Sequence, residues 1–553
     1  MKNSLVELSA RNRAYALIDE NKGRELVGPL DYVISPHLLP QGIVPESDDG
    51  VVLVKGKIAG KSTIIISIEG KFQGGGIGEV AGAKIVAALE AALQDNKNGH
   101  EVYPVIILDT GGVRLQEANY GLLAISEIQN VIVALKEFVP VIGLIPGKVG
   151  SFGGMSITAA LMSYLIATDK ARIALNGPEV IEQEAGVREF DASDKDLIWD
   201  TLGAKQRVKT GIVDEVVVDD VETIKVAINA AMVAKKDVHR TEKIDFYLSL
   251  LDQVDFNKEL TPAKYNEIYA MVNTKPHFVT KALASHQKQT NSRGRAWFEA
   301  LTGIKNAKTN VSTVLYAETD GKVYIAIVPD EHNSAFPRVK NGEVGLKEGF
   351  AVASIIRQVI KEDADKTNKR PIVAIVDVPS QAYGYKEELI GIHIALAASA
   401  SAYAKARQVG HPVVNLIAGD AVSGGFLAHG LQANRMIALA DKSIVIQAMS
   451  KASAARITQR TIAELEEATK HVPAMAYDIF NYQKLGALYK LVDNVKCKDV
   501  SPEKIKIIKD LLEQAIAEAK RDSTLHFRYE NSIAQKMGRK ATNKVRRLVK
   551  EQW

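Results

Sequence analysis

The stretches YPVIILDTGG (103–112) and RPIVAIVDVPSQ (370–381) decide the fold class of this chain. Each is a run of aliphatic and β-branched residues that reaches an aspartate and then enters a short turn. In both halves of the chain a helical stretch follows, then a second apolar strand (139–145 and 411–417), a Gly-Gly pair and a helix of small residues. Strands and helices alternating in this way are typical of right-handed βαβ crossovers in a parallel sheet.

The two halves repeat these features at a nearly constant spacing. The offset from Pro104 to Pro371 in the sequence is almost the same as the offset from Gly153 to Gly424. Chance can align one proline or one glycine pair, but it does not align strand, helix, strand, Gly-Gly and helix in one order. The chain, at 553 residues, is also too long for a single hydrophobic core. We therefore predict two similar α/β domains in tandem.

A polar stretch between residues 252 and 295 marks the boundary between the repeats. We assign the first domain to residues 1–284, a linker to residues 285–293 and the second domain to residues 294–553. The alternative is a surface helical hairpin with no domain boundary, and the internal repeat favours the boundary.

Composition narrows the class of protein. A net charge of +4, with 46% hydrophobic and 25% charged residues, gives no overall field that favours nucleic acid or a membrane surface. The single cysteine, Cys497, excludes an internal disulfide and a cysteine-based zinc site, and it fits a reducing compartment. The N-terminal stretch 1–20 lacks the apolar core of a signal peptide, and charges and a proline interrupt the apolar run 131–145. We expect a soluble, cytoplasmic protein that binds neither nucleic acid nor membrane.

Glycine pairs stand at two successive strand ends of the first half, at Gly111-Gly112 and at Gly153-Gly154. Two preorganised N–H donors are the best stabilisers of an oxyanion, and glycine lets the backbone approach a ligand closely. Neighbouring strand ends of one parallel sheet can place two such donors side by side. Because the second half repeats the pattern at Gly424-Gly425, a functional site is favoured over ordinary tight turns.

Two other glycine motifs have different interpretations. Gly74, Gly75 and Gly76 follow a strand and precede a helix, where free N–H groups can hold a phosphate or a carbonyl oxygen; a purely structural turn is an equal alternative. Their spacing does not match the dinucleotide fingerprint G-x-G-x-x-G. Residues 56–62 are one residue short of a P-loop and lie between two β-rich runs, so we predict a hairpin turn and exclude nucleotide hydrolysis.

The remaining titratable residues give weaker indications. Glu179 and Glu182 are candidate acid–base residues, but acids at a helix start are commonly caps. His429, on an apolar stretch, is a core histidine in our interpretation. No cluster has the spacing of a metal site, so we predict no metal. The basic stretch 536–550 could meet an acidic carrier protein or a phosphate, and a solvated helix is the alternative.

Several motifs of the chain resemble those of a known family. Residues 72–85, 110–118 and 150–183 resemble the β-type half of acyl-CoA carboxyltransferases. Across nearly the whole chain the closer resemblance is to the malonyl-carrier-protein decarboxylase of biotin-independent malonate decarboxylases, and it is supported by residues 9–20, 47–52 and 294–303. In that family a β and a γ subunit form the enzyme, and here they are fused. The resemblance implies two crotonase-like ββα-superhelix domains.

The resemblance also implies the chemistry. Malonate would be carried as a thioester on the phosphoribosyl-dephospho-CoA arm of an acyl carrier protein, with no tightly bound cofactor. The partners would be the carrier subunit, its transferase subunit and further copies of the chain. Decarboxylation would form an enolate at Gly112, Val113, Gly153 and Gly154, with the leaving carboxylate facing Gln381, Ala382, Gly424 and Gly425. Candidates to bind the arm are Gly74, Gly75, Gly76, Arg114 and Lys148.

Two alternatives stay open. One is a biotin-dependent carboxyltransferase, although residues 378–381 and 447–449 depart from the Thr-Pro-Gly and Ser-Pro-Glu of its α-type half, and the chain lacks the Met-Lys-Met biotin-attachment triplet. The other is a non-catalytic scaffold that binds a carrier protein or CoA. The donor of the proton to the enolate is also open between water, Tyr383 and Gln183.

Overall fold

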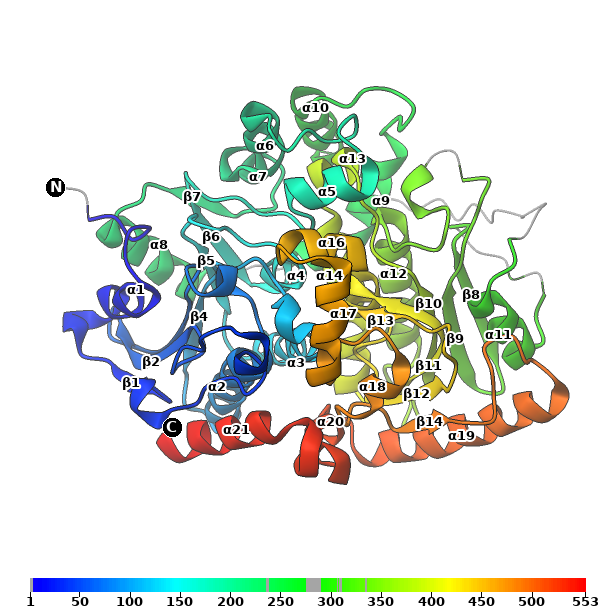
Figure 1. Cartoon of the computed structure of the whole chain (residues 1–553). Coiled ribbons are helices and arrows are strands. Elements are labelled where there is room, and N and C mark those ends of the chain that lie inside the picture. Colours follow the sequence, from blue (N-terminus) through cyan, green and yellow to red (C-terminus); the bar gives the residue numbers. More distant parts are fainter. Residues whose placement is uncertain (1–2, 235–237, 275–289, 306, 308–310, 334–335) are drawn as a thin grey trace.

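Two seven-stranded sheets, one from each half of the chain, organise the protein (Figure 1). The computed structural model describes residues 3–234, 238–274, 290–305, 307, 311–333 and 336–553. The proposed linker, 285–293, lies partly outside these residues. Helices cover both sheets, as an α/β architecture with mainly parallel strands requires.

The first sheet follows the chain in strict order. Its strands are β1 (Arg24–Leu26), β2 (Val51–Ile58), β3 (Lys61–Ile68), β4 (Tyr103–Ile107), β5 (Ile142–Ile145), β6 (Tyr164–Thr168) and β7 (Glu215–Val217). β1, β2 and β3 are antiparallel, and the pairs from β3 to β7 are parallel. The tight turn between β2 and β3 lies at Ala59 and Gly60, both with positive φ, which confirms a hairpin in place of a phosphate-binding loop.

The helices of the first half follow the strand ends. They are α1 (Ala10–Leu17), α2 (Glu79–Lys97), α3 (Ala118–Leu135), α4 (Gly154–Leu161), α5 (Pro178–Ala185), α6 (Lys195–Leu202), α7 (Ala204–Lys209), α8 (Val221–Val233), α9 (Ile244–Asp252) and α10 (Pro262–Asn273). β4 is buried along its whole length, as expected for a central parallel strand that is apolar on both faces.

The second half repeats this plan. Its strands are β8 (Val314–Thr319), β9 (Lys322–Ile327), β10 (Ile372–Val378), β11 (Val413–Val422), β12 (Arg435–Leu439), β13 (Ile446–Gln447) and β14 (Lys490–Val492), in the order β14-β12-β11-β10-β9-β8, with β13 beside β11. The series from the first hairpin to α4 matches the series from the β8–β9 hairpin to α15. The internal repeat predicted from the sequence is therefore confirmed.

The helices of the second half carry one addition at the C-terminal end. They are α11 (Arg293–Thr302), α12 (Leu346–Glu362), α13 (Tyr385–Ile390), α14 (Ile392–Gln408), α15 (Ser423–Ala428), α16 (Lys451–Ile457), α17 (Ile462–His471), α18 (Ile479–Gln483), α19 (Pro502–Arg521), α20 (Phe527–Glu530) and α21 (Lys540–Gln552). α21 runs beneath the first half, where it packs against α2 (Figure 1). The second repeat thus ends on the surface of the first.

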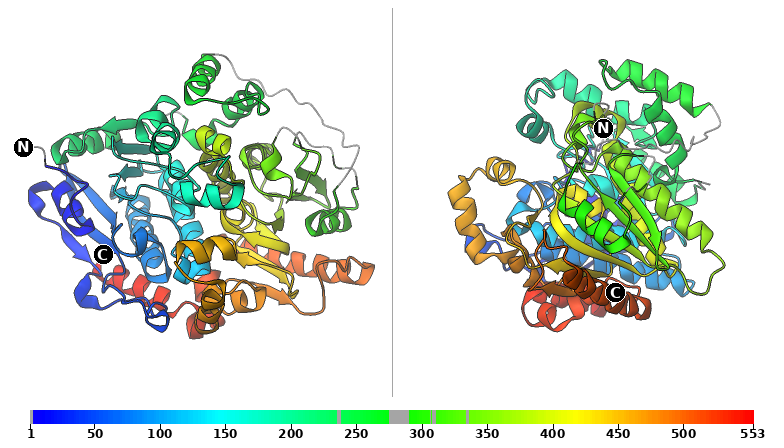
Figure 2. Two further views of the ribbon diagram at one scale, coloured as in Figure 1. Left: turned by 45° about the horizontal axis from the view of Figure 1, so that its top comes forward. Right: turned by 90° about the vertical axis from the view of Figure 1, so that its right-hand side faces the viewer.

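The halves meet through helices that are buried almost completely. α14 packs against α3 and α4 of the first half, and its interface is rich in alanine and serine, so the backbones approach closely. One hydrophobic core runs through both halves, so the expectation that the chain is too long for a single core is wrong. The left view of Figure 2 shows the two halves side by side. The segment Leu115–Leu135 is long and apolar enough to span a bilayer, but 89% of its apolar stretch is buried inside the protein. It is therefore a core helix.

A buried ion pair fixes the C-terminal segment to the first half. Arg539 donates to both carboxylate oxygens of Glu127 on α3, at 3.1 and 2.9 Å. The two side chains are only 2% and 3% exposed. The neighbouring Thr542 donates its N–H to Glu79 of α2 at 2.9 Å. The charge that helps to hold α21 in place is thus almost completely shielded from water.

Replacing Arg539 by Met leaves the buried carboxylate of Glu127 without its partner. Removing one member of a buried pair costs about 3–5 kcal/mol, so we expect the urea midpoint of Arg539→Met to fall strongly. Arg547→Met on the same segment is the control, because that side chain is 68% exposed and its ion pair with Glu551, at 3.7 Å, lies in water. Equal midpoints for the two variants would contradict this role of Arg539.

Candidate functional site

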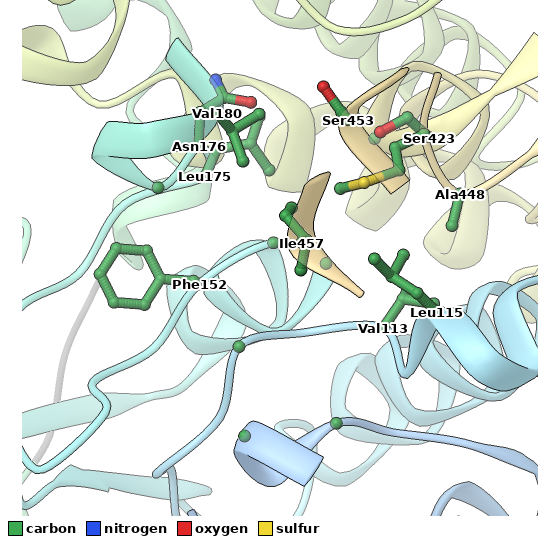
Figure 3. A pocket seen from close by; sticks show the side chains of 18 of the residues that line it. Val113, Leu115, Phe152, Leu175, Asn176, Val180, Ser423, Ala448, Ser453 and Ile457 are labelled. Carbon is green, nitrogen blue, oxygen red and sulfur yellow. The ribbon is translucent and has the colours of Figure 1, made fainter. Parts of the chain in front are cut away.

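A cavity of about 670 Å³ lies where the two halves meet, and side chains of both halves line it. Figure 3 shows Val113, Phe152 and Asn176 of the first half facing the same space as Ser423, Ala448 and Ile457 of the second. The first half contributes the segments that follow the carboxyl ends of β4, β5 and β6. In parallel α/β sheets, ligands bind outside the carboxyl ends of the strands.

Two backbone segments of the first half touch in the wall of this cavity. Gly112 has φ +101°, and a Cβ atom added there would lie 2.8 Å from the carbonyl oxygen of Phe152 and 3.3 Å from the nitrogen of Gly154. Gly153 has φ +56° and returns the contact, because a Cβ there would lie 3.1 Å from the Gly111 oxygen. Only glycine fits this approach without strain.

The contact leaves two N–H groups without an acceptor. Among the described residues, neither Val113 N–H nor Gly154 N–H makes a hydrogen bond, and both residues line the cavity. Gly112 and Gly153 were expected to contribute donors, but the Gly112 N–H donates to the Thr110 hydroxyl at 3.0 Å. The Gly153 N–H donates to the backbone of residue 175 at 2.9 Å. The available donors are therefore those of the residues that follow each glycine.

The extended backbone around Val113 explains why its N–H is free. Ile77 bonds to the flanking residues, donating to the Gly112 oxygen at 2.8 Å and accepting from Arg114 N–H at 3.0 Å. In an extended chain, alternate groups point to opposite sides. The N–H of Val113 is thus directed away from Ile77. At Gly154 the cause is different, since the first N–H groups of a helix have no partner within the helix.

The predicted residues of the second half divide between the wall and the layer behind it. Gln381 and Gly424 line the cavity. Ala382 and Gly425 are buried behind them and are not part of the lining. A Cβ atom on Gly425 would lie 2.5 Å from the Ser380 oxygen, so this glycine serves close backbone packing.

A buried carboxylate connects the site to the second half. Glu388 accepts from the N–H groups of Leu175 and Asn176 at 3.1 and 2.7 Å and from the Asn176 amide at 2.8 Å. Burial raises the pKa of Glu388 to about 7, and the Arg207 guanidinium, 4.0 Å away, opposes that shift. Because the Leu175 oxygen accepts from Gly153, Glu388 positions the segment that holds the start of α4. The sequence pattern pointed to Glu179, which lines the cavity, and to Glu182, which pairs with Arg456, and gave no sign of Glu388.

Two predicted ligands of the carrier arm do not have the charge or the position for that role. The guanidinium of Arg114 is buried and pairs with Asp49 and Glu117, both at 2.7 Å. Arg114 lines the cavity, but its charge is already compensated, which argues against a nucleotide phosphate as its ligand. Lys148 is exposed and is not part of the cavity lining. Neither residue presents a free cation to the cavity.

The glycine-rich segment contributes backbone. Gly74 and Gly76 line the cavity. Gly75 lies behind them, with φ +67°, and a Cβ there would lie 2.1 Å from the Asp109 oxygen. The segment is held against the end of β4 by the Gly111 N–H, which donates to the Gly74 oxygen at 2.8 Å.

One cation of the cavity wall was missed from the sequence. Arg172 is half-buried and lies over the rings of Phe152 and Trp199, with 5.8 and 5.7 Å to the ring centres. In the described part of the chain no carboxylate lies within 4.0 Å of it. By contrast, Arg456, also in the lining, pairs with Glu182 at 3.2 Å. In the sequence, Arg172 is only a lone arginine two residues after Lys170, on a strand-like segment, and no motif marks it as functional.

Both protein candidates for the proton donor lie in the wall. Tyr383 lines the cavity, and burial raises the pKa of its phenol, so it stays protonated near neutral pH. Gln183 also lines it, and its side-chain oxygen accepts from Arg456 at 2.9 Å. His429 is fully buried, bonds to Tyr403 and to a backbone oxygen, and has its pKa lowered to about 4 by burial. It is a core histidine, as expected.

Two family models match the chain. The carboxyl transferase domain matches residues 25–336, which is more than half of the sequence, and the malonate decarboxylase gamma subunit matches residues 339–553. The chain therefore belongs to the carboxyl transferase family. Within that family it is a malonate decarboxylase component in which the β-type and γ-type parts are fused.

Individual proteins are similar to parts of the chain. Malonyl-S-ACP:biotin-protein carboxyltransferase MADC of Malonomonas rubra is 41% identical over 239 residues, which are 41% of this chain and 75% of that protein. MADD of the same organism is 40% identical over 166 residues, 30% of this chain and 57% of MADD. A Pseudomonas malonate decarboxylase hetero-tetramer in complex with malonate contains a chain that is 46% identical, with 48% of this chain and 98% of that chain covered and a TM-score of 0.48.

Proposed function

We propose that this enzyme decarboxylates a malonyl thioester, carried on an acyl carrier protein, to an acetyl thioester and CO₂. The observation that carries the proposal is the pair of unpartnered N–H groups of Val113 and Gly154 on one cavity, within the part of the chain that the structure describes. The names of the relatives support the substrate class, since MADC and MADD are malonyl-S-ACP carboxyltransferases and the Pseudomonas enzyme is a malonate decarboxylase.

In the mechanism that we infer, the thioester oxygen accepts hydrogen bonds from Val113 N–H and Gly154 N–H. The bond between the α-carbon and the carboxylate breaks, CO₂ leaves, and the electron pair delocalises onto the thioester oxygen as an enolate. The two donors bind the enolate more strongly than the neutral thioester, and such a donor contributes roughly 3 kcal/mol to the transition state. A proton from Tyr383 then reaches the α-carbon, because this phenol is a far stronger acid than the amide of Gln183, and water reprotonates the phenol.

The leaving carboxylate faces the second half in this proposal. That half contributes the apolar side chains Leu427, Ala448 and Met449 to the cavity wall. Removing water from a carboxylate disfavours the anion relative to neutral CO₂, which moves the equilibrium toward decarboxylation. Gln381 and Gly424 complete this part of the wall.

We also infer the setting of the reaction. Each half is a crotonase-like unit, with boundaries at residues 1–284 and 294–553, and the chain works in the cytoplasm. The carrier subunit delivers the thioester on a CoA-like arm, which the transferase subunit attaches, and the chain assembles with further copies of itself. A relative crystallised with coenzyme A supports an arm of this kind.

The proposal is tested by incubating the purified chain with malonyl-CoA, a surrogate for the carrier thioester, in the absence of biotin and ATP. We expect acetyl-CoA and CO₂ in equal amounts. A carboxyltransferase, the activity named for MADC and MADD, would form little acetyl-CoA until a biotin acceptor is added, and would then form carboxybiotin in place of CO₂. A binding scaffold would bind malonyl-CoA without turnover, and that result would reject the enzymatic proposal.

Val113→Pro removes one N–H donor of the proposed oxyanion hole without removing the cavity. We expect the rate constant for decarboxylation to fall about 10² to 10³-fold, the usual cost of one oxyanion-hole donor. Val113→Ala is the matched control, because it shortens the side chain and keeps the N–H. Thermal unfolding of both variants separates a lost donor from a lost fold. Equal rates in folded Val113→Pro and Val113→Ala would contradict the assignment.

Arg172 is the cation that we assign to a phosphate of the carrier arm. A charge-assisted hydrogen bond contributes about 1.5–3 kcal/mol, so Arg172→Ala should raise KM for malonyl-CoA about 10- to 100-fold and leave kcat nearly unchanged. Lys148→Ala, which removes an exposed cation outside the lining, is the control and should change neither constant. A fall in kcat at unchanged KM would instead place Arg172 at the reacting carboxylate.

A further inference from the structure

The second half repeats the backbone geometry that frees the N–H of Val113. Val344 donates to the Ser380 oxygen and accepts from Ala382 N–H, both at 3.0 Å, in the way that Ile77 bonds on either side of Val113. The residues that follow Ile77 and Val344 are both glycines that begin a long helix. Their dihedral angles are nearly identical, at φ −110° and −112° and ψ −157° and −159°. The residue between Ser380 and Ala382 therefore occupies the place of Val113.

The starts of α4 and α15 correspond in the same way. Gly153 has φ +56° and is followed by Gly154, whereas Ser423 has φ +61° and is followed by Gly424. Gly424 is thus the structural counterpart of Gly154, one position away from the match with Gly153 that the sequence suggested. A non-glycine residue with positive φ is unusual, and Ser423 shows that the backbone shape is kept at some cost in strain.

One difference separates the two sites. In the first half both donors are free, but in the second half the N–H of Gly424 donates to the side-chain Oε1 of Gln381 at 2.9 Å. The other end of that carboxamide donates to Asn176 Oδ1 at 2.7 Å, and Gln381 is only 5% exposed. Among the described residues, the backbone N–H of Gln381 itself has no acceptor. The carboxamide oxygen lies where an oxyanion would accept from Gly424.

We propose that the carboxamide of Gln381 closes the second-half counterpart of the first oxyanion hole, whose donors are the N–H groups of Gln381 and Gly424. The closure excludes the carbonyl oxygen of a molecule that could accept CO₂. This inference rests on the proposed decarboxylation. Because only the first oxyanion hole is open, the cavity binds the thioester oxygen but no molecule that could accept CO₂. The CO₂ is therefore released. Gln381 is thus a specificity-determining residue.

Opening the hole would permit transfer in place of release. A cyclic urea held through its carbonyl oxygen would lose the proton of one ring nitrogen to the α-carbon of the enolate. That nitrogen would then form a bond to the carbon of CO₂, giving an N-carboxylate and the acetyl thioester. No oxidant, reductant or further co-reactant is needed. Biotin contains such a urea, and MADC and MADD are named for a biotin-protein acceptor, so free biotin is the probe.

The experiment compares two substitutions that both remove the bond to Asn176. Gln381→Val installs the residue found in the open hole, whereas Gln381→Met keeps a side chain of similar length in the space. With malonyl-CoA and free biotin, we expect Gln381→Val to form acetyl-CoA at least tenfold faster than without biotin, with carboxybiotin in place of free CO₂. The unsubstituted enzyme and Gln381→Met should show no biotin dependence.

Biotin binding in the absence of malonyl-CoA separates this proposal from the proposed function. Calorimetry should show at least tenfold tighter binding by Gln381→Val than by the other two proteins, even if none of them turns over malonyl-CoA. The proposal is overturned if folded Gln381→Val binds biotin no better than Gln381→Met, or if the unsubstituted enzyme already carboxylates biotin. It is overturned as well if Gln381→Val and a second opening variant, Gln381→Ala, both fail to fold while Gln381→Met folds, because the side chain then only fills space.

Discussion

No side chain fits between the segment that follows β4 and the segment that begins α4. The carbonyl oxygen of Phe152 and the backbone of Gly153 lie so close to Gly112 that a single added carbon would overlap them. This contact fixes the carboxyl end of β4 relative to the start of α4. Since the donors are backbone groups, their direction depends on this packing and not on side-chain rotamers, and little reorganisation is needed when charge develops.

The second half of the chain makes this contact part of a closed site. Glu388 receives three hydrogen bonds from residues 175 and 176, and the same segment accepts the N–H of Gly153. Leu427 lies against Gly154, because a Cβ added there would be 2.9 Å from its Cδ1 atom. The second half therefore supports the backbone of the first half that carries the free N–H groups. Fusion into one chain keeps the two parts at a fixed ratio and geometry.

The arginines of the cavity wall differ in whether a carboxylate neutralises their charge. Arg114 is compensated by Asp49 and Glu117, and Arg456 by Glu182, so these arginines serve structure. Arg172 has no carboxylate partner in the described part of the chain and lies over aromatic rings, an environment that favours a guanidinium. One of its N–H groups donates to the Val149 oxygen at 3.4 Å, and the others stay available. An anion entering the cavity meets the charge of Arg172, which can orient it, and the exposed carboxylate of Glu179 also lines the cavity.

The sequence by itself determined the two-fold repeat, the parallel strands, the hairpin at residues 56–62 and the glycine pairs at strand ends. Periodicity and glycine requirements are local, and they survive without knowledge of long-range contacts. Only the tertiary structure decided which N–H groups are free. The oxygens of Thr110, Ile77 and Leu175 accept hydrogen bonds from the N–H groups that neighbour the two free ones. The tertiary structure also decided that Arg114 is neutralised, that Arg172 has no carboxylate partner among the described residues, and that the Gln381 side chain accepts from Gly424. Hydrogen-bond satisfaction and charge compensation depend on partners that are far away in the chain, and no local pattern records them.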